Sequence, residues 1–146
     1  MTMGERETAE HFAERYRVAP AEVSRRIELA VIGGDWGANG YTTMAQAGLL
    51  AHELGLRPSA RLLDLGAGRG WPGLYLAAAT GCRVVLADRP IEGLRGAAAR
   101  ARRETLAARA RRETLAARAA PVVASARALP FPPATFDAIV HTDVLC

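Results

Sequence analysis

The feature that most constrains the fold is a short apolar run that ends in a glycine-rich turn. The run covers residues 61–65, and the turn contains Asp64, Gly66, Gly68 and Gly70. Such a short apolar run, closed by a turn, is typical of a buried strand. Because glycine lacks a Cβ atom, the turn allows backbone to pass close to a bound molecule. The sequence therefore predicts a strand followed by a ligand-binding turn.

The chain after this turn alternates between helical patterns and short apolar runs. Strands that alternate with helices pair in parallel through right-handed crossovers, which defines an α/β fold. Helices are expected over residues 71–80 and 91–119, and further strands over residues 83–87 (ending at Asp88), 121–124 and 136–141.

The chain before residue 59 lacks this alternation and has the pattern of a helical segment. Two helices are expected first, with a break near Pro20, which suits the first position of the second helix. A glycine-rich loop over residues 32–40 leads to a third helix, which Thr42 or Thr43 can cap.

A nine-residue segment occurs twice in tandem within the last helical pattern, since residues 101–109 are repeated unchanged as residues 110–118. Nine residues make about two and a half helical turns, so the second copy is rotated by about 180°. Leu106 and Leu115 would then face opposite sides of a straight helix. We expect the extra turns to project past the sheet or the helix to break before Pro121. A tandem duplication explains the repeat more simply than a partner-binding helix does.

The positive charge of the chain does not indicate a nucleic-acid partner. The net charge is +4, and all 19 basic residues are arginine. Six of these arginines lie in the two repeat copies, where no aromatic residue is interleaved to stack on bases. A solvated helix face is the expected role of this basic stretch.

Neither a membrane span nor a metal site is expected. No apolar run approaches the ~18 residues that a spanning helix needs, and the N-terminus lacks the apolar stretch of a signal peptide. The two cysteines, Cys82 and Cys146, lack metal-ligand spacing. These observations predict a cytoplasmic protein.

Two cofactors compete for the glycine turn. A dinucleotide fingerprint that begins at Gly66 would place its third glycine at the position of Trp71, whereas the third glycine is Gly70. Asp64, two residues before the first glycine, suits an ammonium group better than a pyrophosphate. The spacing therefore favours S-adenosylmethionine over NAD. Asp88 can accept both ribose hydroxyls in a bidentate contact, or it can cap the following helix.

These strings resemble the motifs of class I methyltransferases, in the style of small-molecule enzymes related to the ubiquinone and menaquinone C-methyltransferases. Residues 61–70 resemble the first motif, residues 84–88 the acidic second motif, and residues 128–131 and 136–140 the third and fourth. The resemblance covers residues 61–145. It implies a Rossmann-like three-layer sandwich with a partial parallel sheet of order 3-2-1-4, preceded by an N-terminal helical segment.

The resemblance also implies a division of the chain. Residues 1–58 would form a helical lid segment, and residues 59–146 a half-domain that binds S-adenosylmethionine. Further strands normally follow the fourth one in this family. We therefore expect a C-terminally truncated chain whose fourth strand is an exposed edge, open to self-association.

The resemblance assigns roles in the donor site. The glycine turn would line the methionine part and Asp64 would fix its ammonium, directly or through water. Asp88 would hold the ribose, and the residues after the second and third strands would contact adenine. His141 would lie beneath the methionine part, or it is an ordinary core or edge histidine. The expected cofactor-binding residues are Asp64, Gly66, Ala67, Gly68, Gly70, Asp88, Arg89, Ser125, Ala126, His141, Tyr41 and Thr42.

Tyr41 and Thr42 lie in the loop expected to cover the donor pocket and shape the acceptor pocket, unless it is a plain helix-entry loop. No catalytic base is assigned, since His52, His141 and Asp143 are candidates and none of them stands out from the sequence. The implied function is methyl transfer from S-adenosylmethionine to a small-molecule acceptor. The alternative is an inactive truncated fragment or pseudoenzyme module that binds the cofactor or a partner without catalysis.

Overall fold

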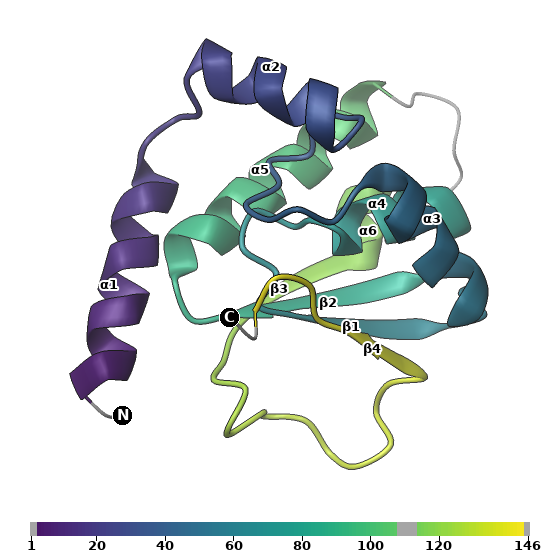
Figure 1. The fold of residues 1–146 in the computed structure, drawn as a ribbon. Coiled ribbons are helices and arrows are strands. Elements are labelled where there is room, and N and C mark those ends of the chain that lie inside the picture. Colours follow the sequence, from purple (N-terminus) through teal and green to yellow (C-terminus); the bar gives the residue numbers. More distant parts are fainter. Residues whose placement is uncertain (1–2, 108–113, 145–146) are drawn as a thin grey trace.

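Four parallel strands form one sheet of order β3-β2-β1-β4 in the computed structural model, which describes residues 3–107 and 114–144 (Figure 1). The predicted α/β fold and strand order are confirmed. The strands are β1 (Arg61–Leu65), β2 (Arg83–Asp88), β3 (Ala119–Val123) and β4 (Ala138–Val140). The helices are α1 (Met3–Arg17), α2 (Glu22–Val31), α3 (Met44–Glu53), α4 (Gly73–Thr80), α5 (Ile91–Ala107) and α6 (Leu115–Arg118).

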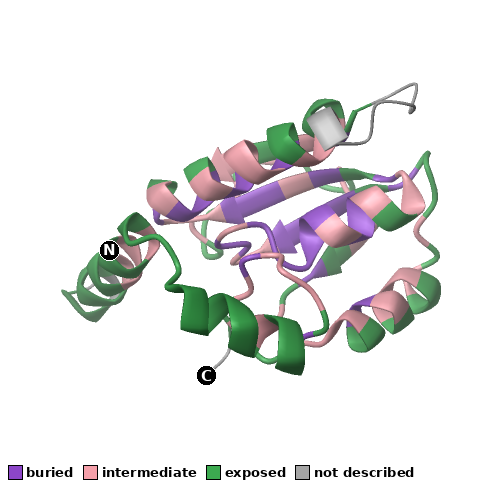
Figure 2. Ribbon diagram, turned by 90° about the horizontal axis from the view of Figure 1, so that it is seen from above, coloured by how far each residue is buried: buried purple, intermediate pink, exposed green. Residues whose placement is uncertain are grey.

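The core lies between the central strands and the helices that cover one face of the sheet. β1 and β2 pair in register, with Leu62 opposite Val84. Both side chains are fully buried against α4 and α5, together with Leu74 and Ala97. Figure 2 shows that the central strands are largely buried. Each buried leucine contributes roughly 1.5–3 kcal/mol of hydrophobic stabilisation. This packing fixes the carboxyl ends of β1 and β2 side by side.

The opposite face of the sheet is covered by a connection and not by a helix. Residues 124–137 run beneath the sheet from the end of β3 to the start of β4 (Figure 1). Leu129, Phe131 and Phe136 of this connection pack around Leu63, which is fully buried. The two phenylalanine rings meet edge to face at 5.0 Å between centroids. Ile139 of the edge strand β4 remains 54% exposed.

The N-terminal helices follow the expected order but differ at one boundary. α2 begins at Glu22 because Ala21 has extended backbone (φ −61°, ψ 153°), so the prediction that Pro20 occupies the first helical position was wrong. Thr43 caps α3, since its Oγ1 accepts from Gln46 N while its own N–H donates to Gln46 Oε1. The capping alternative that names Thr43 is therefore confirmed.

The prediction of one continuous helix over residues 91–119 was wrong, and the alternative of a break before Pro121 is confirmed. α5 ends at Ala107, and Thr114 is extended (φ −81°, ψ 154°) before α6 begins. Leu115 is only 8% exposed and belongs to the core. The break lets the second repeat copy turn this leucine inward, whereas residues 108–113 and the Leu106 side chain lie outside the described residues.

Smaller differences concern the ends of elements. α4 begins two residues later than expected, at Gly73, and β3 begins two residues earlier, at Ala119. β3 starts there because Ala119 already pairs with Val84 of β2. None of the helices within residues 3–107 and 114–144 has both the length and the apolar character needed to cross a membrane.

The repeat supplies a matched pair of threonines in identical local sequence. Thr114 Oγ1 accepts from Ala117 N at the start of α6, whereas Thr105 Oγ1 donates to Ala101 O inside α5 and accepts from Ala116 N. Thr114→Ala should lower the free energy of unfolding by about 1 kcal/mol because a helix cap is lost. Thr105→Ala should lower it by less, about 0.5 kcal/mol, because the better helix propensity of alanine offsets part of the hydrogen bond lost from Ala116 N.

Thermal unfolding of both variants checks this prediction. The loss at Thr114 corresponds to a fall of about 2–6 °C in Tm for a domain of this size. Equal effects of the two substitutions would contradict the assignment of Thr114 as a cap.

Candidate functional site

The predicted site residues gather at one edge of the sheet. Because all four strands are parallel, their carboxyl ends lie at the same edge. β1 leads into the glycine turn and β2 ends at Asp88. Ser125 follows β3, and His141 follows β4 directly. Four segments far apart in sequence therefore contribute to one surface.

The glycine turn has a backbone that other residues rarely adopt. Gly66 has φ +77° and Gly68 has φ +50°, both in the left-handed region. A Cβ atom on Gly68 would lie 2.6 Å from the Tyr16 hydroxyl, and one on Gly66 would lie 2.5 Å from Val144 Cγ2. The turn is held to β2 because Gly66 N donates to Ala87 O at 2.8 Å. Glycine is thus required here by both conformation and space.

Asp88 joins the end of β2 to this turn. Its Oδ2 accepts from Gly68 N at 2.6 Å, and its Oδ1 accepts from Arg89 N at 2.7 Å. Burial raises the pKa of Asp88, while these two backbone donors act in the opposite direction. Each carboxylate oxygen has a second lone pair, so both can still accept a hydroxyl group. The carboxylate is thus held in place by the backbone on either side.

Asp64 lies beneath the turn and not at the open edge. Its side chain is 1% exposed, and Oδ2 accepts from Gly73 N at 2.9 Å at the start of α4. Burial raises the pKa of Asp64 to about 8, the Gly73 N–H opposes this, and the charge of Asp88 adds to it. The carboxyl group thus keeps its proton near neutral pH. It connects β1 to α4 from inside the fold.

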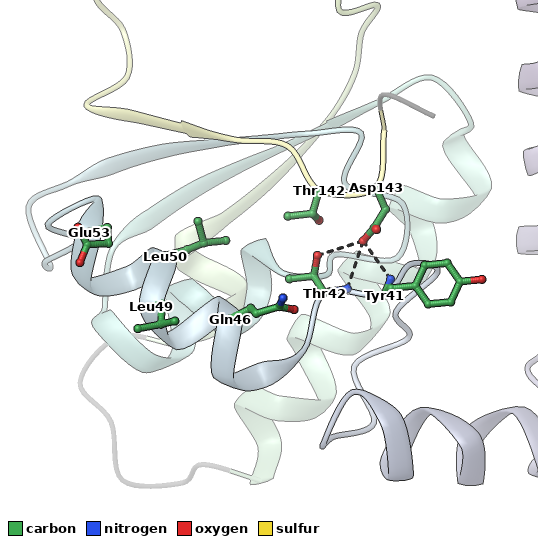
Figure 3. A pocket seen from close by; sticks show the side chains of 8 residues that line it. All are labelled: Tyr41, Thr42, Gln46, Leu49, Leu50, Glu53, Thr142 and Asp143. Carbon is green, nitrogen blue, oxygen red and sulfur yellow. Dashed lines mark hydrogen bonds between the residues drawn. The ribbon is translucent and has the colours of Figure 1, made fainter.

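The loop that contains Tyr41 and Thr42 is held to the segment after β4 (Figure 3). Asp143 Oδ2 accepts from Tyr41 N at 3.1 Å, from Thr42 N at 3.4 Å and from Thr42 Oγ1 at 3.1 Å. Thr42 O accepts from Trp71 Nε1 at 3.0 Å, directly after the glycine turn. The Tyr41 ring is 84% exposed and points away from these contacts. Thr42 therefore links this loop to two segments of the site.

A hollow of about 430 Å³ lies beside this loop, between α3 and the segment after β4 (Figure 3). It adjoins the glycine turn without including it, and Asp88 does not line it. Two leucines of α3 line it, together with hydroxyl, amide and carboxylate groups. The lining residues are Tyr41, Thr42, Gln46, Leu49, Leu50, Glu53, Thr142 and Asp143.

The residues predicted on the adenine side lie next to Asp88. Ala124 N donates to Asp88 O at 2.9 Å, which places the turn after β3 beside the end of β2. Ser125 forms an isolated bridge with Ala128, and Ala126 is exposed between them. Arg89 is partly buried beside Asp88, whereas His141 is exposed after β4.

Sequence reasoning missed two residues at this site, Tyr16 and Asn39. The Tyr16 hydroxyl lies over Gly68 and is hydrogen-bonded to the Asn39 side chain. The helical spacing of Phe12 and Tyr16 indicates that both lie on one face of α1, which could have marked Tyr16 as inward-facing. Residues 3–107 and 114–144 contain no cluster of side chains suited to a metal ion.

The methyltransferase domain family matches residues 63–146, which is more than half of the chain. The chain therefore belongs to this family, whose methyl donor is S-adenosylmethionine. The family assignment agrees with the resemblance found in the glycine turn and the acidic end of β2. No curated protein sequence matches the chain.

Solved structures support the same fold. A geranyl diphosphate methyltransferase in complex with GPP and sinefungin is 21% identical, with a TM-score of 0.63, and the match covers 91% of this chain and 54% of that one. The YcgJ protein from Bacillus subtilis is 25% identical, with a TM-score of 0.53 over 65% of this chain and 36% of that one. The [4+2]-cyclase SpnF is 25% identical, with a TM-score of 0.54, and the match covers 84% of this chain and 49% of that one. The chain thus spans between about a third and about half of the length of these structures.

The raised pKa of Asp64 predicts how stability depends on pH. The folded chain keeps the Asp64 proton up to about pH 8, whereas an unfolded chain releases it near pH 3.9. The free energy of unfolding therefore falls as the pH rises between these values, by at most about 1.4 kcal/mol per pH unit for this carboxyl. In the Asp64→Asn variant the free energy of unfolding should fall less steeply with pH, because an amide cannot ionise.

Urea unfolding at about pH 5 and about pH 8 measures the slope. Glu14→Gln, which changes an exposed carboxylate on α1, is the control and should keep the wild-type slope. An Asp64→Asn variant with the wild-type slope would contradict the buried, protonated state of Asp64.

Proposed function

We propose that this chain binds S-adenosylmethionine at the carboxyl edge of its sheet and transfers the methyl group to a small-molecule acceptor. The observation that carries the proposal is the Asp88 carboxylate, held at the end of β2 by Gly68 N at 2.6 Å. A fixed carboxylate acceptor suits the hydroxyl groups of a ribose. The glycine turn beside it lets the methionine part of the ligand lie close to the backbone. The family supplies the identity of the donor.

Each predicted residue takes a role that its position allows. Asp88 accepts from the ribose hydroxyls, and Gly66 and Gly68 leave room for the methionine part along the turn. Arg89, Ser125 and Ala126 border the adenine side, where Ser125 Oγ and the Ala126 backbone provide hydrogen-bonding groups. Asp64 acts from beneath, since its carboxyl is buried against Gly73 and reaches the ligand only through the turn.

S-adenosylmethionine, when bound, would supply a methyl group on a positively charged sulfur. An acceptor atom would attack the methyl carbon in line, and the sulfur would leave as S-adenosylhomocysteine. The protein then contributes mainly position and exclusion of water. The loop around Thr42 closes the edge, because Asp143 and Trp71 hold it from two sides. In this proposal residues 1–58 form a lid segment over the donor-binding half, residues 59–146.

The hollow beside the loop is the proposed side of acceptor entry. Leu49 and Leu50 in its lining suit a small molecule with an apolar portion. Asp143 lines the hollow, and His141, two residues earlier in the chain, is exposed. The geranyl diphosphate methyltransferase of the same fold also acts on a small molecule with an apolar portion.

A second candidate is a module that binds the cofactor without catalysis. It is favoured by a match to a protein that is not named as a methyltransferase. One matched protein is named as a [4+2]-cyclase, so this fold also serves a reaction of another kind. Donor binding is common to both candidates, and methyl transfer separates them.

Isothermal titration calorimetry with S-adenosylhomocysteine tests donor binding. The wild-type chain should bind one equivalent, and Asp88→Asn should weaken binding about 10- to 100-fold, because hydrogen bonds to a charged acceptor are lost. Asp137→Asn is the matched control. Asp137 accepts from Arg61 N at the opposite end of the sheet, so this substitution should leave the affinity unchanged.

A folded wild-type chain that binds no S-adenosylhomocysteine would overturn the proposal. Binding without any transfer of a radiolabelled methyl group to a panel of small apolar acceptors would favour the non-catalytic module.

A further inference from the structure

Tyr16 of α1 lies directly on the glycine turn, although 48 residues separate it from Asp64. Its ring lies between the turn and the start of α5. A Cβ atom on Gly68 would be 2.6 Å from the Tyr16 hydroxyl, and one on Gly93 would be 3.0 Å from Tyr16 Cδ2. Two glycines thus make room for one tyrosine. The hydroxyl group therefore lies close to Gly68, whose N–H donates to Asp88.

The surroundings of the hydroxyl are polar and acidic. It is hydrogen-bonded to the Asn39 side chain, which comes from the loop between α2 and α3. Burial raises the pKa of Tyr16, and the negative charge of Asp88 raises it further. The phenol therefore stays protonated and can donate. A donor beside the Asp88 carboxylate complements its acceptor oxygens.

The position of Tyr16 is set by the glycine turn itself. Arg69 Nη2 donates to Val18 O at 2.6 Å and to Tyr16 O at 3.2 Å, at the end of α1. The Arg69 guanidinium also lies 5.6 Å from the centre of the Tyr16 ring. Arg17 of α1 forms an ion pair with Glu92 of α5 at 2.9 Å. These contacts fix the end of α1 at the turn, although most of α1 is exposed (Figure 2).

We propose that Tyr16 is a donor-binding residue whose hydroxyl contacts the ribose of S-adenosylmethionine, opposite Asp88. This inference rests on the proposed function and deepens it. Asp88 provides acceptors and Tyr16 provides a donor, so a ribose between them is bound through both kinds of group. Asn39 orients the phenol from the loop side. α1 then forms part of the donor site and not only a cover.

Tyr16→Phe tests this role, with Tyr75→Phe as the matched control. Tyr75 belongs to an aromatic cluster with Trp36 and Trp71, and its hydroxyl group faces α3, 4.0 Å from a Cβ atom built on Gly48. Calorimetry should show that Tyr16→Phe weakens S-adenosylhomocysteine binding roughly three- to tenfold, the value of one neutral hydrogen bond. Tyr75→Phe should bind as the wild type does.

A second ligand separates a ribose contact from a structural effect. The 2′,3′-dideoxy analogue of S-adenosylhomocysteine lacks the hydroxyl groups, so wild type and Tyr16→Phe should bind it with equal affinity. A merely structural role would weaken the binding of both ligands by the same factor and would overturn the inference. If Tyr16→Phe does not fold by circular dichroism, Asn39→Ala is measured in its place, with the same expected pattern.

The outcomes for the inference and for the proposed function differ. A wild-type chain that binds neither ligand overturns both. If the wild-type chain binds S-adenosylhomocysteine and the affinity of Tyr16→Phe is within a factor of two of the wild-type value, the role of Tyr16 is overturned. The proposed function then stays in place.

Discussion

The hydrogen bond between Gly68 N and the Asp88 carboxylate is the contact on which the site depends. It joins the ends of β1 and β2, the two strands whose register the core already fixes. A carboxylate that is partly removed from water carries a cost in free energy, which its backbone donors offset. The bond also holds the turn in a conformation that only glycine adopts readily. Fold and site are therefore specified by the same short stretch of chain.

A second layer of the site is built from segments before β1. Arg69 in the turn holds the end of α1, Trp71 after the turn donates to Thr42, and Asp143 after β4 accepts from the same threonine. The N-terminal segment is thus attached at two points near the C-terminal end of the glycine turn. A movement of the N-terminal segment away from the sheet would therefore break contacts with residues at the end of the turn.

The sequence predicts what depends on local pattern. β1, β2 and the turn follow from apolar runs and glycine spacing, and the comparison with the methyltransferase family agrees with them. Tyr16 and the role of Asp143 depend on contacts across 52 and 101 residues, which no local pattern encodes. The repeat shows the same limit, because Thr105 lies inside a helix and Thr114 begins one, within identical sequence. Tertiary packing of Leu115 decides between them.

The most direct test of this account is a map of the residues that respond to the donor. Amide resonances of the ¹⁵N-labelled chain would be followed by NMR while S-adenosylhomocysteine is added. We predict the largest chemical-shift changes at the amides of Gly66, Gly68 and Asp88, and little change at Arg61 at the opposite end of β1. Shifts centred on α3 and the hollow, with the glycine turn unchanged, would contradict it.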